Sequence, residues 1–214
     1  LRLDSIVNVN LSSKYEQNYD ANGNPTLYIY YTWNTDSQSF VPFFKLEYTY
    51  DANGNRTLFI GYVWNTNSES FVLLYKDEYT YDANGNRTLV IAYVWNTNSE
   101  SFVPDYKDEY TYDANGNMTL DVSYTWSTDS ESFVPDYKYE YTYNANGNWT
   151  LRTRYTWETD NESFVLTGKT EYTYDANGNR TLDINYRWNT DSQSFVLDYK
   201  SEYTYDANGN RTLY

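Results

Sequence analysis

Carboxylates, amides and amines recur at fixed spacing in this chain, and they are the side chains that could do chemistry. Asp51, Asn53 and Asn55 place three oxygen-bearing side chains at alternate positions, and hard cations such as Ca²⁺ prefer oxygen ligands. An EF-hand calcium loop has glycine at its sixth position and a bidentate glutamate at its twelfth. Here Gly54 comes fourth and no such glutamate follows. The sequence therefore predicts no resident cofactor, with calcium as the alternative.

A second recurring pair is a lysine followed two residues later by a glutamate, as in Lys45 and Glu47. Two carboxylates can hydrolyse a glycoside, but a glutamate beside a lysine on one strand face is explained by ordinary charge pairing. The chain has no His and no Cys. Ser–His–Asp and Cys–His catalysis are therefore excluded, and we expect no enzyme activity.

Charge and hydropathy limit the partners. The 214 residues include 15 basic and 30 acidic side chains, a formal net charge of −15. Nucleic acids and anionic membrane surfaces are bound by basic patches, so we expect no nucleic acid partner. No apolar run approaches about 18 residues, the length that would indicate insertion into a membrane.

The side chains singled out above belong to a tandem repeat. The motif Tyr-Asp-Ala-Asn-Gly-Asn, with Asn144 in place of Asp in one copy, returns every 31 residues from Tyr19 to Tyr205. Fixed self-similarity at such a period indicates a repeat array. We expect residues 1–13 to form an N-terminal cap, because they lack the motif, and residues 14–214 to form the array. The last copy is incomplete, which suggests a piece of a longer protein.

Each unit reads as two strands separated by turns. In the copy from Phe71 to Ser101, apolar side chains alternate with polar ones over residues 71–82 and 87–95, and residues 96–101 are rich in Asn, Ser and Thr, which favour turns. No sustained helical period is present. The sequence predicts an all-β antiparallel meander of 31-residue hairpins, forming an elongated coiled sheet. A closed barrel and a face-to-face dimer are the alternatives.

The glycine turn predicts the register of each hairpin. A type I turn followed by a left-handed glycine needs a three-residue loop, residues 52–54, with Asp51 opposite Asn55. The same register sets Tyr48 opposite Leu58, Leu46 opposite Ile60 and Phe44 opposite Tyr62, so that the apolar faces agree. A two-residue loop would set Leu58 opposite Thr49 and mix apolar with polar faces. The scaffold interpretation depends on Tyr48 and Leu58 sharing a face. The residues assigned to the structural turn are Asp51, Asn53, Gly54 and Asn55.

Aromatic side chains mark the other turn and the expected core. Trp64 can lie opposite Phe71 across a loop near residues 66–69, and a slip by two residues is also allowed by parity. Burial of large rings dominates the energetics of a sheet, so we expect the period-31 tryptophans to form a structural core: Trp33, Trp64, Trp95, Trp126, Trp157 and Trp188.

The outward face of the second strands differs between copies, being apolar in the N-terminal half and polar in the C-terminal half. An apolar patch on an outer face suggests contact with a partner, a second copy or a glycan. The alternative is that coiling buries this face against neighbouring sheet. The candidate contact residues are Tyr28, Tyr30, Phe43, Phe59 and Val63.

The stretch "EYTYDANGNRTL" resembles the YD repeats of Rhs and teneurin shells, which carry a Tyr-Asp-x-x-Gly core. The resemblance covers only the turn half of each unit, because those repeats are shorter and lack the half that contains tryptophan. The long units with tryptophan are similar to repeats in secreted or surface proteins of gliding bacteria, and more weakly to choline- and glucan-binding repeats. The resemblance implies an extracellular or cell-surface β-array.

These observations favour a non-enzymatic, extracellular structural repeat protein, such as a stalk, an adhesin shaft or a filament segment. Open sheet edges can add strands from another molecule, so we expect self-association through sheet edges or through the aromatic face. A carbohydrate- or cell-wall-binding module is the alternative. A further alternative is part of a YD-repeat shell that encloses a toxin.

Overall fold

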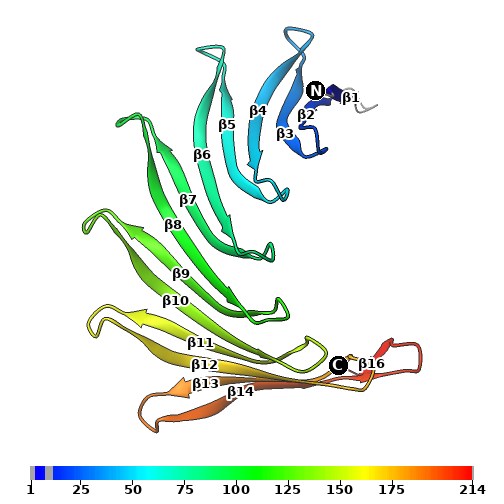
Figure 1. Ribbon diagram of the computed structural model, residues 1–214, viewed down its shortest axis with the longest axis vertical. Helices are drawn as coiled ribbons and strands as arrows, with labels where there is room; N and C mark the ends of the chain where they lie inside the picture. The colour runs from blue at the N-terminus through cyan, green and yellow to red at the C-terminus, as the bar shows by residue number, and fades with distance from the viewer. Residues whose placement is uncertain (1–2, 8–11, 214) are drawn as a thin grey trace. The chain divides into compact units, whose positions relative to one another are not determined.

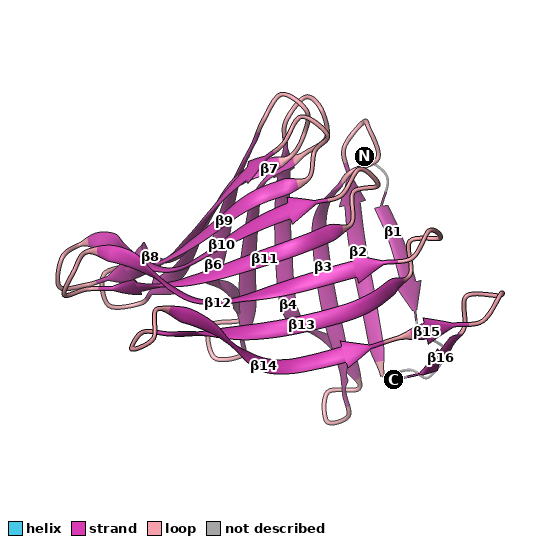
Figure 2. Ribbon diagram, turned by 90° about the horizontal axis from the view of Figure 1, so that it is seen from below, coloured by secondary structure: helices cyan, strands magenta, loops and turns pink. Residues whose placement is uncertain are grey.

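The computed structural model describes residues 3–7 and 12–213, and every regular element in them is a β-strand (Figure 2). The predicted N-terminal cap lies partly outside these residues, and its described part forms the first strand. The described residues contain no helix, and so none long and apolar enough to cross a membrane. The strands are β1 (Leu3–Val7), β2 (Ser13–Tyr19), β3 (Pro25–Asn34), β4 (Ser39–Tyr50), β5 (Arg56–Asn65), β6 (Ser70–Tyr81), β7 (Arg87–Asn96), β8 (Ser101–Tyr112), β9 (Met118–Ser127), β10 (Ser132–Tyr143), β11 (Trp149–Glu158), β12 (Ser163–Tyr174), β13 (Arg180–Asn189), β14 (Ser194–Glu202), β15 (Thr204–Tyr205) and β16 (Arg211–Leu213).

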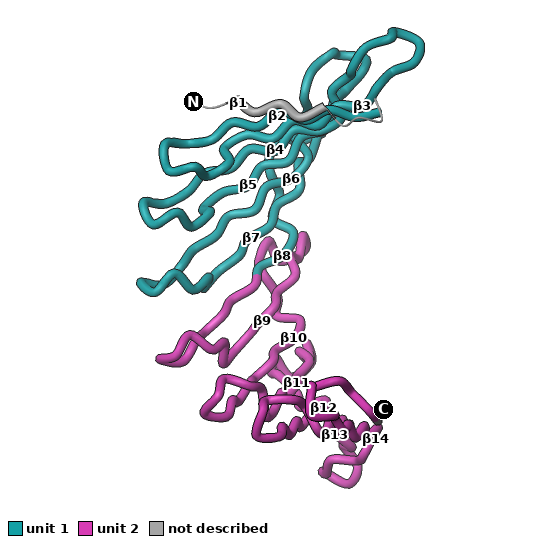
Figure 3. The backbone as a smooth tube through the Cα atoms, turned by 90° about the vertical axis from the view of Figure 1, so that its right-hand side faces the viewer, with its two compact units in different colours: residues 1–107 teal, residues 108–214 magenta. Residues whose placement is uncertain are grey.

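The strands form a meander, in which neighbours in the chain are neighbours in the sheet (Figure 1). The main sheet runs in the order β1 to β14 without returning to β1, and β15 pairs with β16. The predicted fold class, an open antiparallel array of hairpins, is therefore confirmed. The chain divides into two compact units, Leu1–Lys107 and Asp108–Tyr214 (Figure 3).

The glycine turn has the predicted geometry. In the turn between β4 and β5, the Asp51 amide donates to the Asn55 carbonyl at 2.9 Å and the Gly54 amide donates to the Asp51 carbonyl at 3.1 Å. Gly54 has a φ of 84°, a left-handed conformation that is costly for a residue with a Cβ. The three-residue loop with Asp51 opposite Asn55 is confirmed.

The register beyond this turn differs from the prediction because the hairpin contains a β-bulge. Tyr50 pairs with Arg56, but Thr49 pairs with Leu58, so Thr57 is an extra residue on β5. A single extra residue reverses which side chains share a face. Tyr48 and Leu58 therefore point to opposite faces. The prediction that they share a face is wrong, and a scaffold role can no longer be argued from it.

The two other predicted pairs are wrong for the same reason. Leu46 lies opposite Gly61 and not Ile60, and Phe44 lies opposite Val63 and not Tyr62. The Thr57 bulge recurs at the period of the repeat, at Thr26, Thr88, Thr150 and Thr181.

The polar turn between β5 and β6 also leads into a bulge. Trp64 pairs with Phe71 and Asn65 with Ser70, so the first of the two registers left open by parity is the observed one. Farther along, Tyr62 pairs with Leu73 but Gly61 pairs with Tyr75, which leaves Leu74 as the extra residue. The apolar residues of β6 are therefore divided between the two faces of the sheet.

The two bulges give each unit two unlike faces, which we call the tryptophan face and the tyrosine face. In the hairpin of β4 and β5, the tryptophan face carries Phe40, Pro42, Lys45, Glu47, Thr49, Leu58, Ile60, Tyr62 and Trp64. The tyrosine face carries Val41, Phe44, Leu46, Tyr48, Phe59, Gly61 and Val63. Both faces are partly apolar, which explains why the sheet forms although the predicted sharing of faces fails.

The buried side chains lie mainly on the tyrosine face. Tyr79, Val90 and Ala92 are 8%, 5% and 5% exposed, and each belongs to this face by register. The tryptophans are not a closed core, because Trp33 is 41% exposed and the five others are only half-buried. Each contacts a phenylalanine across the polar turn, with ring centroids 5.0 Å apart for Trp64 and Phe71.

Candidate functional site

The carboxylate oxygens of Asp51 are hydrogen-bonded within the glycine turn. Asp51 Oδ1 accepts hydrogen bonds from the amides of Asn53 and Asn55 at 2.9 Å, and Oδ2 accepts one from Asn55 Nδ2 at 3.0 Å. These hydrogen bonds, the Asn55 side chain first, hold the pKa of Asp51 below its usual value. Three or more acidic side chains do not gather as a potential metal site anywhere in the described part of the chain. Both carboxylate oxygens of Asp51, one of the three side chains considered as calcium ligands, thus accept hydrogen bonds within the turn.

Successive turns are fastened to one another by tyrosines. The Tyr50 hydroxyl, at the end of β4, donates to the Pro25 carbonyl at the start of β3 at 2.9 Å. The equivalent Tyr81 hydroxyl donates to the Arg56 carbonyl at 2.8 Å. The first tyrosine of the repeated motif thus ties the glycine turn to the hairpin before it at Tyr50, Tyr81, Tyr143 and Tyr205.

The Lys–Glu pairs lie on the tryptophan face and form triads with a tyrosine. Lys45 Nζ lies 2.8 Å from Glu47 Oε1 and 3.7 Å from the centroid of the Tyr62 ring. The Tyr62 hydroxyl donates to Glu47 Oε2 at 2.6 Å. The three groups satisfy one another, as expected for structural charge pairs rather than for the unlike, poised carboxylates of a hydrolase.

Titration shifts in the equivalent triad of the second unit have the same origin. The hydrogen bond from Lys138 lowers the pKa of Glu140 against the opposing effect of burial, and the Tyr155 hydrogen bond adds to this lowering. Burial, with the hydrogen bond to Glu140, raises the pKa of Tyr155 to about 12. Glu140 is therefore ionised and Tyr155 neutral around neutral pH.

The five candidate contact residues all lie on the tyrosine face of the first unit. Phe44 stacks against Tyr28 and Tyr30, with centroids 5.7 and 5.3 Å away. Phe43, the bulge residue of β4, meets Tyr30 edge-on at 6.4 Å and is 55% exposed. The structure thus brings Tyr28, Tyr30 and Phe43 together.

The two remaining candidates lie on the next hairpin. Phe59 stacks on Tyr48 at 5.3 Å, and Val63 lies opposite Phe44 and is 38% exposed. An apolar groove of about 380 Å³ runs beside them and joins the two hairpins. Its lining residues are Phe43, Phe44, Leu46, Tyr62, Val63, Leu74 and Tyr75.

Sequence reasoning did not identify Leu74 as part of this surface. Leu74 is 46% exposed and occupies the same bulge position as Phe43, one period later. A change of residue type at that position, from Phe and Leu to Asp105 and Asp136 in later copies, is the signal that could have marked it as solvent-facing.

Comparison with known proteins supports the fold and leaves the activity open. Residues 7–77 match the family described as "Family of unknown function (DUF3836)". A crystal structure of a protein with unknown function from Bacteroides fragilis NCTC 9343 has a TM-score of 0.50 at 18% identity, covering 64% of this chain and 96% of that one. At this identity the similarity shows the fold alone. No functionally curated protein sequence matches the chain.

Two further solved structures are similar to this chain. One matches less than half of this chain, and the other matches only a small part of its own length. A DUF3836 family protein from Bacteroides vulgatus ATCC 8482 is 24% identical, with a TM-score of 0.36, covering 42% of this chain and 89% of that chain. The crystal structure of TcdB2-TccC3-TEV is 14% identical, with a TM-score of 0.33, covering 92% of this chain and 14% of that chain. Neither score is high enough to support an argument about function.

Proposed function

We propose that the chain is a non-enzymatic structural repeat protein of the cell exterior, such as a stalk, an adhesin shaft or a filament segment. The observation that carries the proposal is a tyrosine hydrogen bond that joins a hairpin to the one before it and that recurs in four copies at multiples of the 31-residue period. The turn-to-turn bond of Tyr50 recurs at Tyr81, Tyr143 and Tyr205. In an array of this kind, stability is a sum of unit and neighbour terms, so length can vary without loss of fold.

A deletion series tests the scaffold role. Removing residues 113–143, one whole period, should leave a folded sheet. Its far-ultraviolet circular dichroism spectrum should keep its shape, and the urea concentration at the midpoint of unfolding should decrease modestly. Removing half a period is the matched control. It deletes one strand of a hairpin, so the remaining strands can no longer pair with their side chains on the correct faces. Equal loss of folding in both deletions would contradict the scaffold role.

The location is tested separately from the fold. We expect protease added to intact producing cells to remove the protein, while a cytoplasmic marker is spared. Rods or fibres in negative-stain micrographs of the purified chain would support a filament segment. A protein that is protected in intact cells and degraded only after lysis would refute the exterior location.

A carbohydrate-binding module is the second candidate. It is favoured by the Phe43 side chain on the tyrosine face of the first unit, which is 55% exposed. A saturable signal on a glycan array should be lost in Phe43→Ala. Leu197→Ala, which removes an equally exposed side chain from β14, is the control and should retain it. Equal signals from both variants would argue against this role.

A further inference from the structure

One glycine interrupts the aromatic positions of the tyrosine face. The position held by Phe44, Tyr75, Tyr106, Tyr137 and Tyr199 in the other copies is Gly168 in β12. Gly168 does not have a positive φ, so a left-handed backbone is not the reason for glycine at this position. Glycine inside a strand often marks a place where another group approaches closely.

Arginines surround this glycine on the same face of the sheet. Arg154 on β11 and Arg187 on β13 are the direct cross-strand neighbours of Gly168. Arg154 Nη2 lies 3.6 Å from the point that a Cβ at position 168 would occupy. That distance is an ordinary contact, but the same point lies 2.5 Å from the Tyr186 carbonyl oxygen of β13, so the neighbouring backbone excludes a side chain at position 168.

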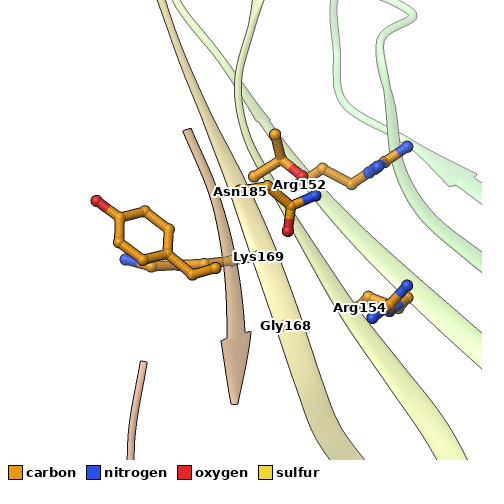
Figure 4. Close-up of a pocket in the computed structure, with 7 residues that line it drawn as sticks. Arg152, Arg154, Gly168, Lys169 and Asn185 are labelled. Carbon is orange, nitrogen blue, oxygen red and sulfur yellow. The ribbon is translucent and has the colours of Figure 1, made fainter. Parts of the chain in front are cut away.

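A second row of polar groups lies beside the first. Arg152, Thr170 and Asn185 are paired in register across β11, β12 and β13. Together with Gly168 and Arg154 they border a cavity of about 20 Å³, room for roughly one oxygen-sized probe. Figure 4 shows Arg152, Arg154 and Asn185 on one side of the ribbon and Lys169 on the other.

The charges of this cluster are not balanced as elsewhere in the chain. Lysines such as Lys45 are paired with a glutamate two residues away, and Arg187 lies 3.3 Å from Asp198. Within the described residues, by contrast, no ion pair joins Arg152 or Arg154 to a carboxylate. Arg152 lies over the Tyr139 ring at 5.4 Å, and Arg154 Nε donates to the Thr167 hydroxyl at 3.1 Å.

The nearby acidic side chains of this face are placed elsewhere. Asp121 on β9 is separated from β11 by Tyr139 of β10, which pairs with both strands. Asp183 lies 3.7 Å from Arg180, opposite Tyr172 in the neighbouring strand. Asp183 Oδ1 is buried without a hydrogen-bond partner, so this face carries charges of both signs. Arg152 and Arg154 are two cations on it that form no ion pair within the described residues.

From this geometry we infer that the tyrosine face around Gly168 is a binding site for an oxyanion group, a carboxylate or a sulfate carried by a ligand. The planar guanidinium donates two parallel hydrogen bonds to such groups. Asn185, on the neighbouring strand β13, offers a further amide donor. The site goes beyond the proposed scaffold role, since a shaft needs no such cluster.

Nuclear magnetic resonance of the full chain tests the site. Sodium acetate and sodium sulfate, titrated separately at constant ionic strength with chloride, distinguish a planar carboxylate from a tetrahedral sulfate. We expect saturable shifts of the Gly168 and Asn185 backbone amides and of the Arg152 and Arg154 Nε–H signals with at least one of them. Absence of saturable shifts with both anions would overturn the inference.

Matched variants locate the binding. Arg154→Gln and Arg152→Gln should each raise the dissociation constant about tenfold or more, because each removes a charge-assisted hydrogen bond. Arg154→Lys keeps the charge but loses the fork, and should bind with intermediate affinity. Arg56→Gln removes the same charge from the first unit, where Arg56 is held against Tyr79, and should change the constant less than about twofold, since separate sites act independently. Equal weakening by Arg56→Gln and Arg154→Gln would show non-specific attraction and refute the site.

Discussion

Gly61 is expected to be required by the ring that covers it, and Gly61→Ala tests this. A Cβ at position 61 would lie 2.5 Å from Cζ, 2.7 Å from Cε1 and 2.9 Å from Cε2 of Tyr75, whereas carbon atoms in favourable contact are about 3.5–4.0 Å apart. The ring must therefore move by about 1 Å. Such overpacking costs about 1–3 kcal/mol, and replacing a strand glycine by alanine returns about 0.5–1 kcal/mol. The net expectation is a loss of up to about 2.5 kcal/mol in the free energy of unfolding.

A double-mutant cycle separates the ring from the backbone. In a Tyr75→Ala background the obstruction is gone, so Gly61→Ala should be neutral or stabilising, and the coupling between the two changes should exceed about 1 kcal/mol. Urea unfolding followed by far-ultraviolet circular dichroism, fitted with a nearest-neighbour model, gives the free energies. Ala92→Gly, the reverse change one period later in a side chain that is 5% exposed, is the control and should destabilise. If Gly61→Ala had the same effect in both backgrounds, the covering ring would not be the reason for the glycine.

Three further predictions concern the turns. Tyr81→Phe removes the 2.8 Å hydrogen bond to the Arg56 carbonyl and should cost about 0.5–1.5 kcal/mol in urea unfolding; no change would show that the turns are not fastened by this bond. Glu100 has a φ of 49°, so Glu100→Gly should raise the free energy of unfolding by up to about 1 kcal/mol through relief of left-handed strain, and a decrease would contradict this. Hydrogen bonds lower the pKa of Asp51 and also the pKa values of the aspartates at the equivalent turns, Asp20, Asp82, Asp113, Asp175 and Asp206. A carboxyl group with a lowered folded pKa stabilises the fold above its unfolded value and loses that contribution as pH falls through the folded value, so stability should fall most steeply below about pH 4. Asp→Asn at these turns, which reproduces the natural Asn144 turn, should flatten that dependence, and a flat wild-type profile from pH 5 to pH 3 would refute it.

The sequence was sufficient to predict the hairpins and the glycine turn, because their signals are local. The turn residues from Asp51 to Asn55 determine their own hydrogen bonds, and alternation along residues 87–95 is a property of one strand. The bulges could not be predicted in this way, since an extra residue at Thr57 or Leu74 is a property of two strands together. One missed residue reverses a face, so the error at Thr57 placed Tyr48 and Leu58 together. The same bulge explains the position of the charge pairs. Lys45 lies opposite Tyr62 and Glu47 opposite Ile60, so both charged side chains share a face with Trp64.

The candidate site was predicted in part for the same reason. The five contact residues share the tyrosine face in the structure, as their alternation suggested, but the adjoining Leu74 depends on the bulge. The arginine cluster could not be recognised from charge counts, because Arg152 and Arg154 come from one strand while Gly168 and Arg187 come from two others. Only the register brings these residues into one row.

The bulges also explain how one array can hold a constant fold and a variable surface. On the tryptophan face, the Lys–Glu–Tyr triads and the Trp–Phe pairs recur from unit to unit and carry contacts within the sheet, as with Lys45 and Lys138. A change on that face would break a contact repeated at each junction. On the tyrosine face, the bulge position presents Phe43 in one copy and Asp136 in another at the same place in the hairpin. Because the bulge side chains are not needed for these contacts, the bulge position can differ between copies without changing the register, whereas buried positions of the same face, such as Tyr79 and Val90, cannot.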